Sequence, residues 1–284
     1  MRTGANPFTD PAEVQGPLYA AADRLASRTS ALHRARVSGR HAADVIADLA
    51  ADGANPAPAV IADIGCGRGT TTLTLADRFP RARIAAIDLS AALLTATRNR
   101  TGSPGRAAAL RADFHRLPLT DRACDLIVAA FCLYHSPDPA SVITEIARCL
   151  TNKGTAVIAV KSADSYRELD RLMAASGLDP AAESRPSLYQ AAHSGNITAL
   201  AETRLAVRRA VHETHRFVFP ALADTAEYLA TSPKYHLPPA LAGSADALAR
   251  ALARALAARL PDQPITATSV VTYLVAGPKL GTPR

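Results

Sequence analysis

Short apolar runs and helical periods alternate along the middle of the chain. Between residues 59 and 162 the apolar runs predict strands over 59–65, 83–90, 108–114, 124–134 and 154–162. Apolar residues at helical spacing predict helices over 70–79, 91–100 and 140–150. Alternation of this kind, with nearly continuous apolar strands, is typical of a parallel sheet covered by helices on both faces. We therefore expect a doubly wound α/β core.

The regions on either side of this core have a different pattern. The first 55 residues read as helices that end near Gly53, and the sequence Asn-Pro-Ala-Pro breaks the chain before the first strand. After residue 162 the pattern predicts helices over 165–178, 187–202, 223–241 and 245–260, and strands over 204–219 and 264–277. The two late strands would complete a mostly parallel, seven-stranded sheet. We accordingly divide the chain into an N-terminal helical lid (1–55), an α/β core (56–162) and a segment of cap helices and edge strands (163–284).

Composition favours a soluble, globular protein. Of the 284 residues 48% are hydrophobic, which is enough for a sizeable core. No stretch approaches the about 18 consecutive apolar residues that span a bilayer, and the polar, proline-bearing start lacks the apolar run of a signal peptide. We expect a cytoplasmic location. The four cysteines have no Cys-x-x-Cys spacing, so we expect buried, reduced thiols and no metal site.

The net charge of +7 comes mostly from arginines that are scattered along the chain. Dispersed charge is typical of a solvated surface rather than of a patch that binds nucleic acid. Leu248, Leu252 and Leu256 form a stripe on the arginine-bearing helix over 245–260, and we expect this stripe to dock on the protein rather than on a membrane. The expected partner is therefore a small molecule, with no nucleic acid and no membrane, for a monomer or a homodimer.

Three glycines, Gly65, Gly67 and Gly69, follow the first strand of the core. A plain strand-to-helix turn needs one glycine, whereas a loop whose backbone approaches a ligand excludes side chains and takes positive φ angles. The dinucleotide pattern Gly-x-Gly-x-x-Gly would need glycine at position 70, where the chain has Thr70. The spacing Gly-x-Gly-x-Gly, preceded by Asp63, instead predicts a loop that passes an adenosine and an amino-acid moiety.

Two further acidic residues end neighbouring strands. Asp88 closes the second strand of the core, 19 residues after Gly69, where a carboxylate accepts hydrogen bonds from both ribose hydroxyls. NAD enzymes carry an acid there as well, so Asp88 alone does not discriminate. Asp113 and Phe114 follow the third strand, where a carboxylate accepts from an adenine amino group and a ring covers the base.

Together these motifs resemble those of the class I S-adenosylmethionine-dependent methyltransferases. The resemblance rests on VIADIGCGRG (60–69), IAAIDLS (84–90), the stretch 111–139 and EIARCLTNKGTAVIAV (145–160), and it covers residues 58–162 closely. It implies S-adenosylmethionine as the cofactor. Carried over by position, it implies that three glycines pass the methionine part, an acid binds the ribose, an acid and a ring bind the adenine, and two residues line the sulfonium: Gly65, Gly67 and Gly69; Asp88; Asp113 and Phe114; Ala130 and Phe131. Asp63, Cys66 and Leu89 are further candidate cofactor-binding residues.

The residues after the fourth strand bear on the acceptor. Methylases of nucleic-acid amino groups carry Asn-Pro-Pro-Tyr or Asp-Pro-Pro-Tyr there, whereas this chain has AFCLYHSPDP (130–139). The resemblance therefore points to methyl transfer to a small-molecule acceptor, with secondary metabolism as one setting. Three alternatives remain: a non-methylating reaction that closes the amino group of S-adenosylmethionine into an azetidine ring and releases methylthioadenosine, an RNA or protein methyltransferase, and a non-catalytic binding protein.

Candidate catalytic residues are His135, after the fourth strand, and Tyr189 and His193, in the predicted cap. A histidine suits the role of general base if the acceptor carries a proton. In related small-molecule methyltransferases the N-terminal helices fold over the cofactor, so Tyr19 and Arg28 are also candidate cofactor ligands. The guanidinium of Arg28 would hold the methionine carboxylate.

Overall fold

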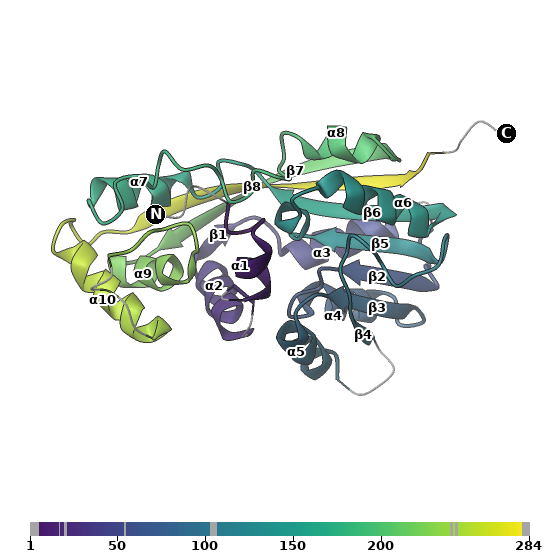
Figure 1. Ribbon diagram of the computed structural model, residues 1–284, viewed down its shortest axis with the longest axis horizontal. Helices are drawn as coiled ribbons and strands as arrows, with labels where there is room; N and C mark the ends of the chain where they lie inside the picture. Colours follow the sequence, from purple (N-terminus) through teal and green to yellow (C-terminus); the bar gives the residue numbers. More distant parts are fainter. Residues whose placement is uncertain are drawn as a thin grey trace. The chain divides into compact units, whose positions relative to one another are not determined.

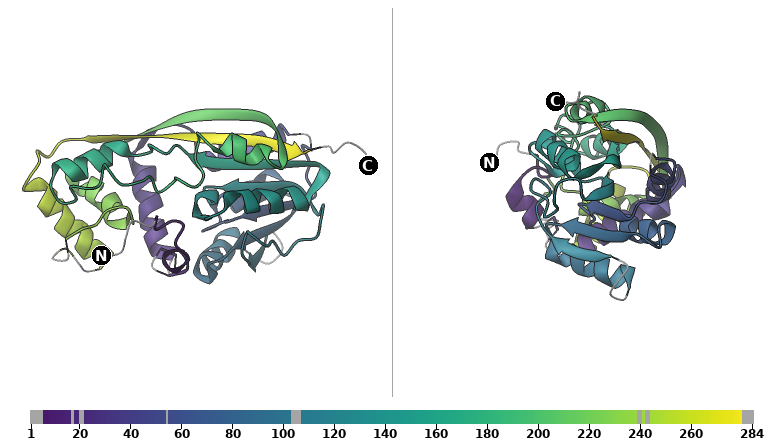
Figure 2. Two further views of the ribbon diagram at one scale, coloured as in Figure 1. Left: turned by 45° about the horizontal axis from the view of Figure 1, so that its top comes forward. Right: turned by 90° about the vertical axis from the view of Figure 1, so that its right-hand side faces the viewer.

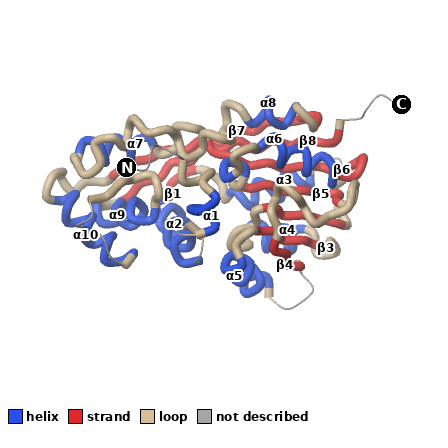
Figure 3. Tube along the Cα trace, viewed as in Figure 1, coloured by secondary structure: helices blue, strands red, loops and turns tan. Residues whose placement is uncertain are grey.

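The computed structural model describes residues 6–16, 18–19, 22–53, 55–102, 107–238, 241 and 244–279. The helices of the described chain (Figure 1) are α1 (Pro11–Gln15), α2 (Ala22–Ala35), α3 (Ala42–Ala51), α4 (Thr70–Arg78), α5 (Ala91–Thr101), the 3-10 turn η1 (Leu133–His135), α6 (Pro139–Cys149), α7 (Arg167–Ala175), α8 (Ile197–Glu202), α9 (Leu222–Thr231) and α10 (Ala245–Ala257). The strands, red in Figure 3, are β1 (Arg36–Ser38), β2 (Val60–Ile64), β3 (Arg83–Asp88), β4 (Ala108–Arg111), β5 (Cys124–Ala130), β6 (Leu150–Lys161), β7 (Leu205–Phe219) and β8 (Ile265–Pro278).

The strands form one sheet in the order β1-β7-β8-β6-β5-β2-β3-β4. Strands β4, β3, β2, β5 and β6 are parallel to one another, whereas β8 is antiparallel to β6. From β2 the chain moves outward to β3 and β4, and it then returns to β5 on the other side of β2. The order of the strands therefore reverses between β2 and β5, and ligands of such sheets lie beyond the carboxyl ends of the strands at that point.

Both faces of the central strands are covered. Leu126 and Val128 of β5 belong to a buried cluster with residues of α3 and α4, while Ile127, which points to the opposite face, is also fully buried. Helix α6 packs on β6 and against α8, and α4 packs between α3 and α5. Burial on two faces explains why these strands read as continuous apolar runs rather than as alternating ones.

The doubly wound, mostly parallel sheet is confirmed, but it has eight strands rather than seven. The additional strand is β1, whose Arg36 pairs with Phe217 in an antiparallel arrangement. Its three residues, Arg36, Val37 and Ser38, are half-buried or exposed and carry no apolar alternation. A hydrophobic pattern cannot reveal such a strand.

Two expected helices are shorter than the pattern predicts. Within 187–202 only α8 is helical, because a turn around Gly195 and Asn196 precedes it. The helix expected over 223–241 ends at Thr231, just before Pro233, which disfavours helix in the residue that precedes it. The Cys residues expected as buried, free thiols are confirmed at all four positions.

The chain divides into two compact units. The first, here called the helical unit, contains Met1–Gly39, Ala163–Leu188 and Glu213–Val270; the second, the α/β unit, contains Arg40–Ser162, Tyr189–His212 and Val271–Arg284. Strands β7 and β8, drawn in green and yellow in Figure 2, contribute residues to both units. These units group the chain differently from the three consecutive segments drawn from the sequence, because α3 and residues 189–212 belong with the α/β core.

Inside the helical unit α9 packs against α2 and α10. Leu252 and Leu256 are fully buried, so the leucine stripe of α10 docks on the protein as expected. A buried carboxylate holds the segment that follows α9: Asp170 accepts from the Lys234 ammonium (2.6 Å) and from the Tyr235 hydroxyl (3.0 Å). In the described part of the chain no helix combines the length and the apolar character needed to cross a membrane.

Candidate functional site

The glycine loop between β2 and α4 has a left-handed backbone. Gly65, Gly67 and Gly69 have φ angles of 62°, 57° and 76°. A Cβ on Gly65 would lie 2.4 Å from Cβ of Cys132, and one on Gly69 would lie 2.7 Å from a methyl carbon of Thr97. Two of the three glycines are therefore required by both the backbone conformation and the available space.

Asp88 joins this loop to the end of β3. One of its carboxylate oxygens accepts from the backbone N–H of Gly67 (2.8 Å), and the other accepts from the backbone N–H of Ser90 (2.9 Å). Burial raises the pKa of the Asp88 carboxyl above its ordinary value, and these backbone donors oppose the increase. An ionised carboxylate has lone pairs beyond the two used here, so Asp88 can also accept from vicinal hydroxyls.

Asp63 is buried beneath the loop. Its side chain is 1% exposed and accepts from the Thr72 hydroxyl (2.6 Å) in the first turn of α4. Burial raises the pKa of the Asp63 carboxyl to about 7. Cys66 is also buried, with its sulfur 3.8 Å from the Thr97 hydroxyl. These two predicted cofactor residues hold the loop between strand and helix.

Asp113 takes part in a chain of hydrogen bonds that sequence reasoning missed. Its carboxylate lies 2.6 Å from Nδ1 of His115, and Nε2 of His115 lies 2.7 Å from the hydroxyl of Ser136. An ionised Asp113 accepts from Nδ1–H, which leaves Nε2 of a neutral imidazole to accept from Ser136. Ser136 in turn accepts from the backbone N–H of Asp138 (3.0 Å). The chain thus orients Asp113 and ties the segment after β4 to the segment after β5.

A group of aromatic side chains surrounds a lysine where β5 and β6 end. The ammonium of Lys161 lies 5.8 Å from the ring centroid of Phe131 and 5.5 Å from that of Tyr189. The Tyr189 ring packs edge-on against Tyr134, at 4.9 Å between centroids, and Tyr134 contacts the ring of His135 at 4.7 Å. The structure therefore brings the predicted residues Phe131, Tyr189 and His135 into one cluster, together with a lysine that was not predicted.

Phe131 has a φ angle of 57°, which is uncommon for a residue other than glycine. Its backbone N–H donates to the carbonyl of Ala159 (2.8 Å), so the neighbouring strand supports the conformation. Strained backbone of this kind is concentrated at functional sites. The turn places the Phe131 ring directly after Ala130, at the carboxyl end of β5.

Comparison with known proteins identifies the family. A methyltransferase-domain family matches residues 62–158. The chain is 30% identical over 191 residues to a trans-aconitate 2-methyltransferase from Acidovorax sp. (strain JS42), a match that covers 64% of this chain and 70% of the relative. The chain belongs to the class I S-adenosylmethionine-dependent methyltransferases. S-adenosylmethionine is accordingly its cofactor.

Other comparisons agree with this methyltransferase assignment. The chain is 31% identical over 113 residues to a malonyl-(acyl-carrier protein) O-methyltransferase from Legionella pneumophila, which covers 40% of each chain. It spans less than half the length of the first malonyl-(acyl-carrier protein) relatives that it matches. Among solved structures, the (4+2)-cyclase SpnF has a TM-score of 0.54 at 17% identity and covers 84% of this chain, with 81% of its own chain matched. That likeness concerns the fold.

Three further predicted residues of the methyltransferase site have polar contacts of their own. The Nδ1 atom of His193 accepts from the backbone N–H of Gly195 (3.0 Å), and burial lowers the pKa of the imidazole. Its polar contact thus stays within its own turn, next to α8. Tyr19 and Arg28 belong to the helical unit, where a guanidinium nitrogen of Arg28 lies 3.5 Å from the Tyr19 hydroxyl. Their role as cofactor ligands stays a prediction.

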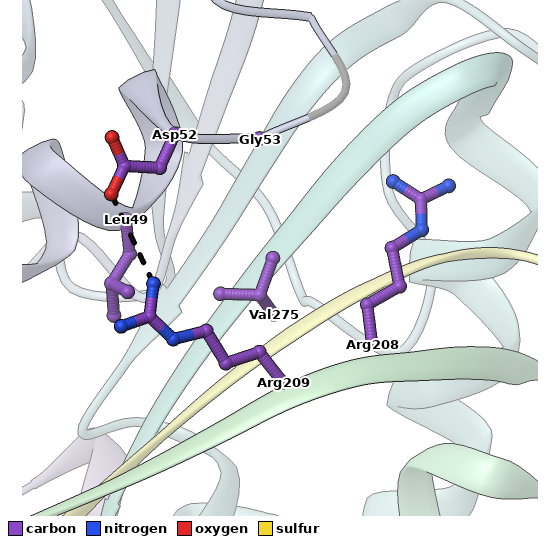
Figure 4. Close-up of a pocket in the computed structure, with 6 residues that line it drawn as sticks. All are labelled: Leu49, Asp52, Gly53, Arg208, Arg209 and Val275. Atoms are coloured by element: carbon purple, nitrogen blue, oxygen red, sulfur yellow. Dashed lines mark ion pairs between the residues drawn. The ribbon is translucent and has the colours of Figure 1, made fainter.

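A pocket of about 430 Å3 opens elsewhere in the α/β unit of the methyltransferase. It is lined by Leu49, Asp52, Gly53, Arg208, Arg209 and Val275 (Figure 4). Arg209 lies 3.9 Å from Asp52, an ion pair marked by the dashed line in Figure 4. None of these lining residues belongs to the glycine loop or to the strand ends that carry Asp88 and Asp113. We therefore do not assign this pocket to the cofactor.

Proposed function

We propose that the protein transfers the methyl group of S-adenosylmethionine to a small-molecule acceptor. The observation that carries the proposal is the hydrogen bond between Asp88 and Gly67, which joins the ribose acid to the glycine loop at the switch point of the sheet. Under this proposal Asp63, Gly65, Cys66, Gly67 and Gly69 accommodate the methionine part of the donor. The remaining donor contacts fall to Asp88 and Leu89 at the ribose, Asp113 and Phe114 at the adenine, and Ala130 and Phe131 at the sulfonium.

Methyl transfer requires little covalent chemistry from the protein itself. Methyl transfer from a sulfonium is an in-line displacement, so the protein must align acceptor oxygen, carbon or nitrogen with the methyl group and exclude water. Positive charge at sulfur disappears as the bond breaks, and an apolar wall favours that change over the charged ground state. Phe131, Tyr134 and Tyr189 supply such a wall in the α/β unit.

The names of the relatives suggest which acceptors to test first. Trans-aconitate and a malonyl group both carry carboxylates, and both proteins are named as methyltransferases. The absence of an Asn-Pro-Pro-Tyr motif after β5 and the dispersed arginines support a small acceptor rather than a nucleic acid. A cytoplasmic monomer or homodimer, with secondary metabolism as its setting, completes the proposal.

One experiment tests the proposal directly. The full-length protein is incubated with S-adenosylmethionine labelled in its methyl group and with an extract of small metabolites from the source organism, and the labelled products are identified by mass. We expect one labelled acceptor and an equal amount of unlabelled S-adenosylhomocysteine. Asp88→Ala should abolish the product, whereas Asp77→Ala, an exposed position on α4, should retain it.

The same experiment distinguishes the non-methylating alternative. Closure of an azetidine ring would leave the label in methylthioadenosine and in no acceptor. That outcome would contradict methyl transfer while keeping the cofactor assignment. A protein that yields neither product and does not bind the donor would contradict the proposed function altogether.

A further inference from the structure

The last residue of β6 is a lysine at the ligand end of the sheet. Ala130 of β5 pairs with Ala159 of β6, and Phe131 donates its backbone N–H to the carbonyl of Ala159. Lys161 lies two residues further along β6, beside the turn that places the Phe131 ring. The side chain of Lys161 thus emerges where the proposed methyl transfer would occur.

Two rings fix the position of this cation. The Lys161 ammonium lies within 6 Å of the centroids of Phe131 and Tyr189, at 5.8 Å and 5.5 Å, which is the range of cation–π attraction. The backbone is held as well, because Ser194 donates its N–H to the carbonyl of Lys161 (3.1 Å). Tyr189 and Ser194 both belong to the segment 189–196, so this one segment contacts both the side chain and the backbone of Lys161.

A fixed ammonium at this place has an electrostatic consequence. S-adenosylmethionine brings a sulfonium cation to the same edge of the sheet, and two like charges in a partly desolvated site repel each other. An anionic acceptor that contacts the ammonium would remove this repulsion and would be drawn to the methyl group at the same time. A neutral acceptor would bring no negative charge to offset the sulfonium.

We propose that Lys161 is the residue that holds the carboxylate of the acceptor, and that the product is a methyl ester. This inference rests on the proposed methyl transfer and names its substrate class. One carboxylate oxygen attacks the methyl carbon, the carbon–sulfur bond breaks, and its electron pair stays on sulfur to give neutral S-adenosylhomocysteine. The carboxylate is already ionised at neutral pH, so no proton has to be removed. Neither His135 nor His193 is then needed as a general base.

The competing role for Lys161 is to hold the carboxylate of S-adenosylmethionine itself. The two roles predict different donor affinities. If Lys161 binds the carboxylate of the donor, its loss weakens the binding of S-adenosylmethionine and of S-adenosylhomocysteine by the same factor, because both carry that group. If Lys161 faces the acceptor, its loss leaves the affinity for S-adenosylhomocysteine unchanged and raises the affinity for S-adenosylmethionine, because only S-adenosylmethionine carries the sulfonium charge.

The test uses the full-length protein with three variants. Lys161→Met removes the charge and keeps the length of the side chain, Lys161→Arg keeps the charge, and Lys153→Met is the matched control at the exposed amino end of the same strand. Calorimetry measures the affinities of S-adenosylmethionine and S-adenosylhomocysteine. Methyl transfer is followed with trans-aconitate and with the metabolite extract as acceptors, and labelled products are treated with mild base, which releases the label of a methyl ester as volatile methanol.

We expect base-labile label in the product of the unaltered protein. Lys161→Met should raise KM for the acceptor roughly 10- to 100-fold, the effect of losing one charged hydrogen bond. It should also increase the preference for S-adenosylmethionine over S-adenosylhomocysteine. Lys161→Arg should restore most of the acceptor affinity, and Lys153→Met should behave as the unaltered protein.

Three results would overturn the inference. Base-stable label would exclude a methyl ester while leaving the proposed function intact. An equal loss of both donor affinities in Lys161→Met would assign the lysine to the carboxylate of the donor. An unchanged KM in Lys161→Met, with normal donor binding, would remove Lys161 from the acceptor site. Failure of the unaltered protein to bind S-adenosylmethionine would instead reject the proposed function, and the inference with it.

Discussion

The Asp88 carboxylate accepts a hydrogen bond of 2.8 Å from the backbone N–H of Gly67. This bond connects the end of β3 to the middle of the glycine loop, two positions that are 21 residues apart in the chain. Because the same carboxylate also accepts from Ser90, its orientation is set before any ligand arrives. A preorganised acceptor loses little conformational entropy on binding.

We predict that Asp88→Ala weakens S-adenosylmethionine binding by about 2 to 4 kcal/mol, because two charge-assisted hydrogen bonds to the ribose would be lost. Calorimetry on the folded variant measures the effect, with Asp77→Ala as the control. An unchanged affinity would remove Asp88 from the cofactor site. Asp88→Asn should weaken S-adenosylmethionine binding less than Asp88→Ala does, because the amide oxygen still accepts a hydrogen bond although the charge is lost.

The hydrogen-bond chain through His115 predicts how the adenine is recognised. Asp113→Ala should weaken the binding of S-adenosylhomocysteine by about 1 to 2 kcal/mol. Binding of its inosine analogue, which lacks the amino group, should be unaffected. His115→Ala should reduce the same discrimination in part, because Asp113 loses the donor that orients it. Paired titrations with the two ligands measure the difference. Equal losses for both ligands would mean that His115 and Asp113 support the loop without recognising the base.

A pair of glycines separates the effect of backbone conformation from that of space. Gly177 has a φ angle of 67°, and among the described residues no atom lies within 4 Å of a Cβ added there, so Gly177→Ala should cost about 1 to 2 kcal/mol for the positive φ angle alone. Gly65→Ala also meets Cys132 at 2.4 Å and should lower the free energy of unfolding by about 1 to 3 kcal/mol more. Urea denaturation of the two variants measures both values. Similar losses would show that the loop shifts away from Cys132 without cost.

Asp63 predicts a pH dependence of stability. Burial raises the pKa of its carboxyl to about 7 from an ordinary value of 3.8, so the folded protein retains a proton that the unfolded chain releases. The free energy of unfolding should therefore fall as the pH rises from about 4 to about 7, by up to about 4 kcal/mol from this group, and stay level above that range. Denaturation of the unaltered protein and of Asp63→Asn at pH 5, 6, 7 and 8 measures it. Asp63→Asn should have the shallower slope; equal slopes would place the titration elsewhere.

The predictable part of the fold and site is the part that depends on local sequence. Gly65 and Gly69 are needed by local backbone geometry, and Asp88 lies at a strand end that its apolar run reveals. The strand-end register then brings the loop and the acid together, because parallel strands align their carboxyl ends. The glycine loop and Asp88 could therefore both be located from the sequence alone.

The unpredicted part depends on contacts between distant positions. His115 reaches Ser136 across 21 residues, and neither residue belongs to a periodic pattern. Lys161 follows five apolar residues, 156–160, at the end of β6, and its chemical setting comes from the turn at Phe131 and the segment carrying Tyr189. Strand β1 is likewise held by backbone pairing to β7, which side-chain pattern does not record.

Tyr189 offers a test of where acceptor specificity lies. Its ring is 7% exposed and contacts Tyr134 and the Lys161 ammonium, whereas the donor motifs lie on the loops after β2, β3 and β4. Tyr189→Phe keeps the ring and should change single-turnover methyl transfer by less than about threefold, while Tyr189→Ala removes the wall and should slow it by about tenfold or more. Donor affinity should shift by less than about 1 kcal/mol in both variants, because the ring belongs to the acceptor side.

The rates of methyl transfer are measured with saturating donor once the acceptor is known, and the affinity for the donor is measured by calorimetric titration. A collapse of donor binding in Tyr189→Ala would assign the ring to the cofactor site; full activity would place the acceptor wall elsewhere, with His135 as the next residue to change.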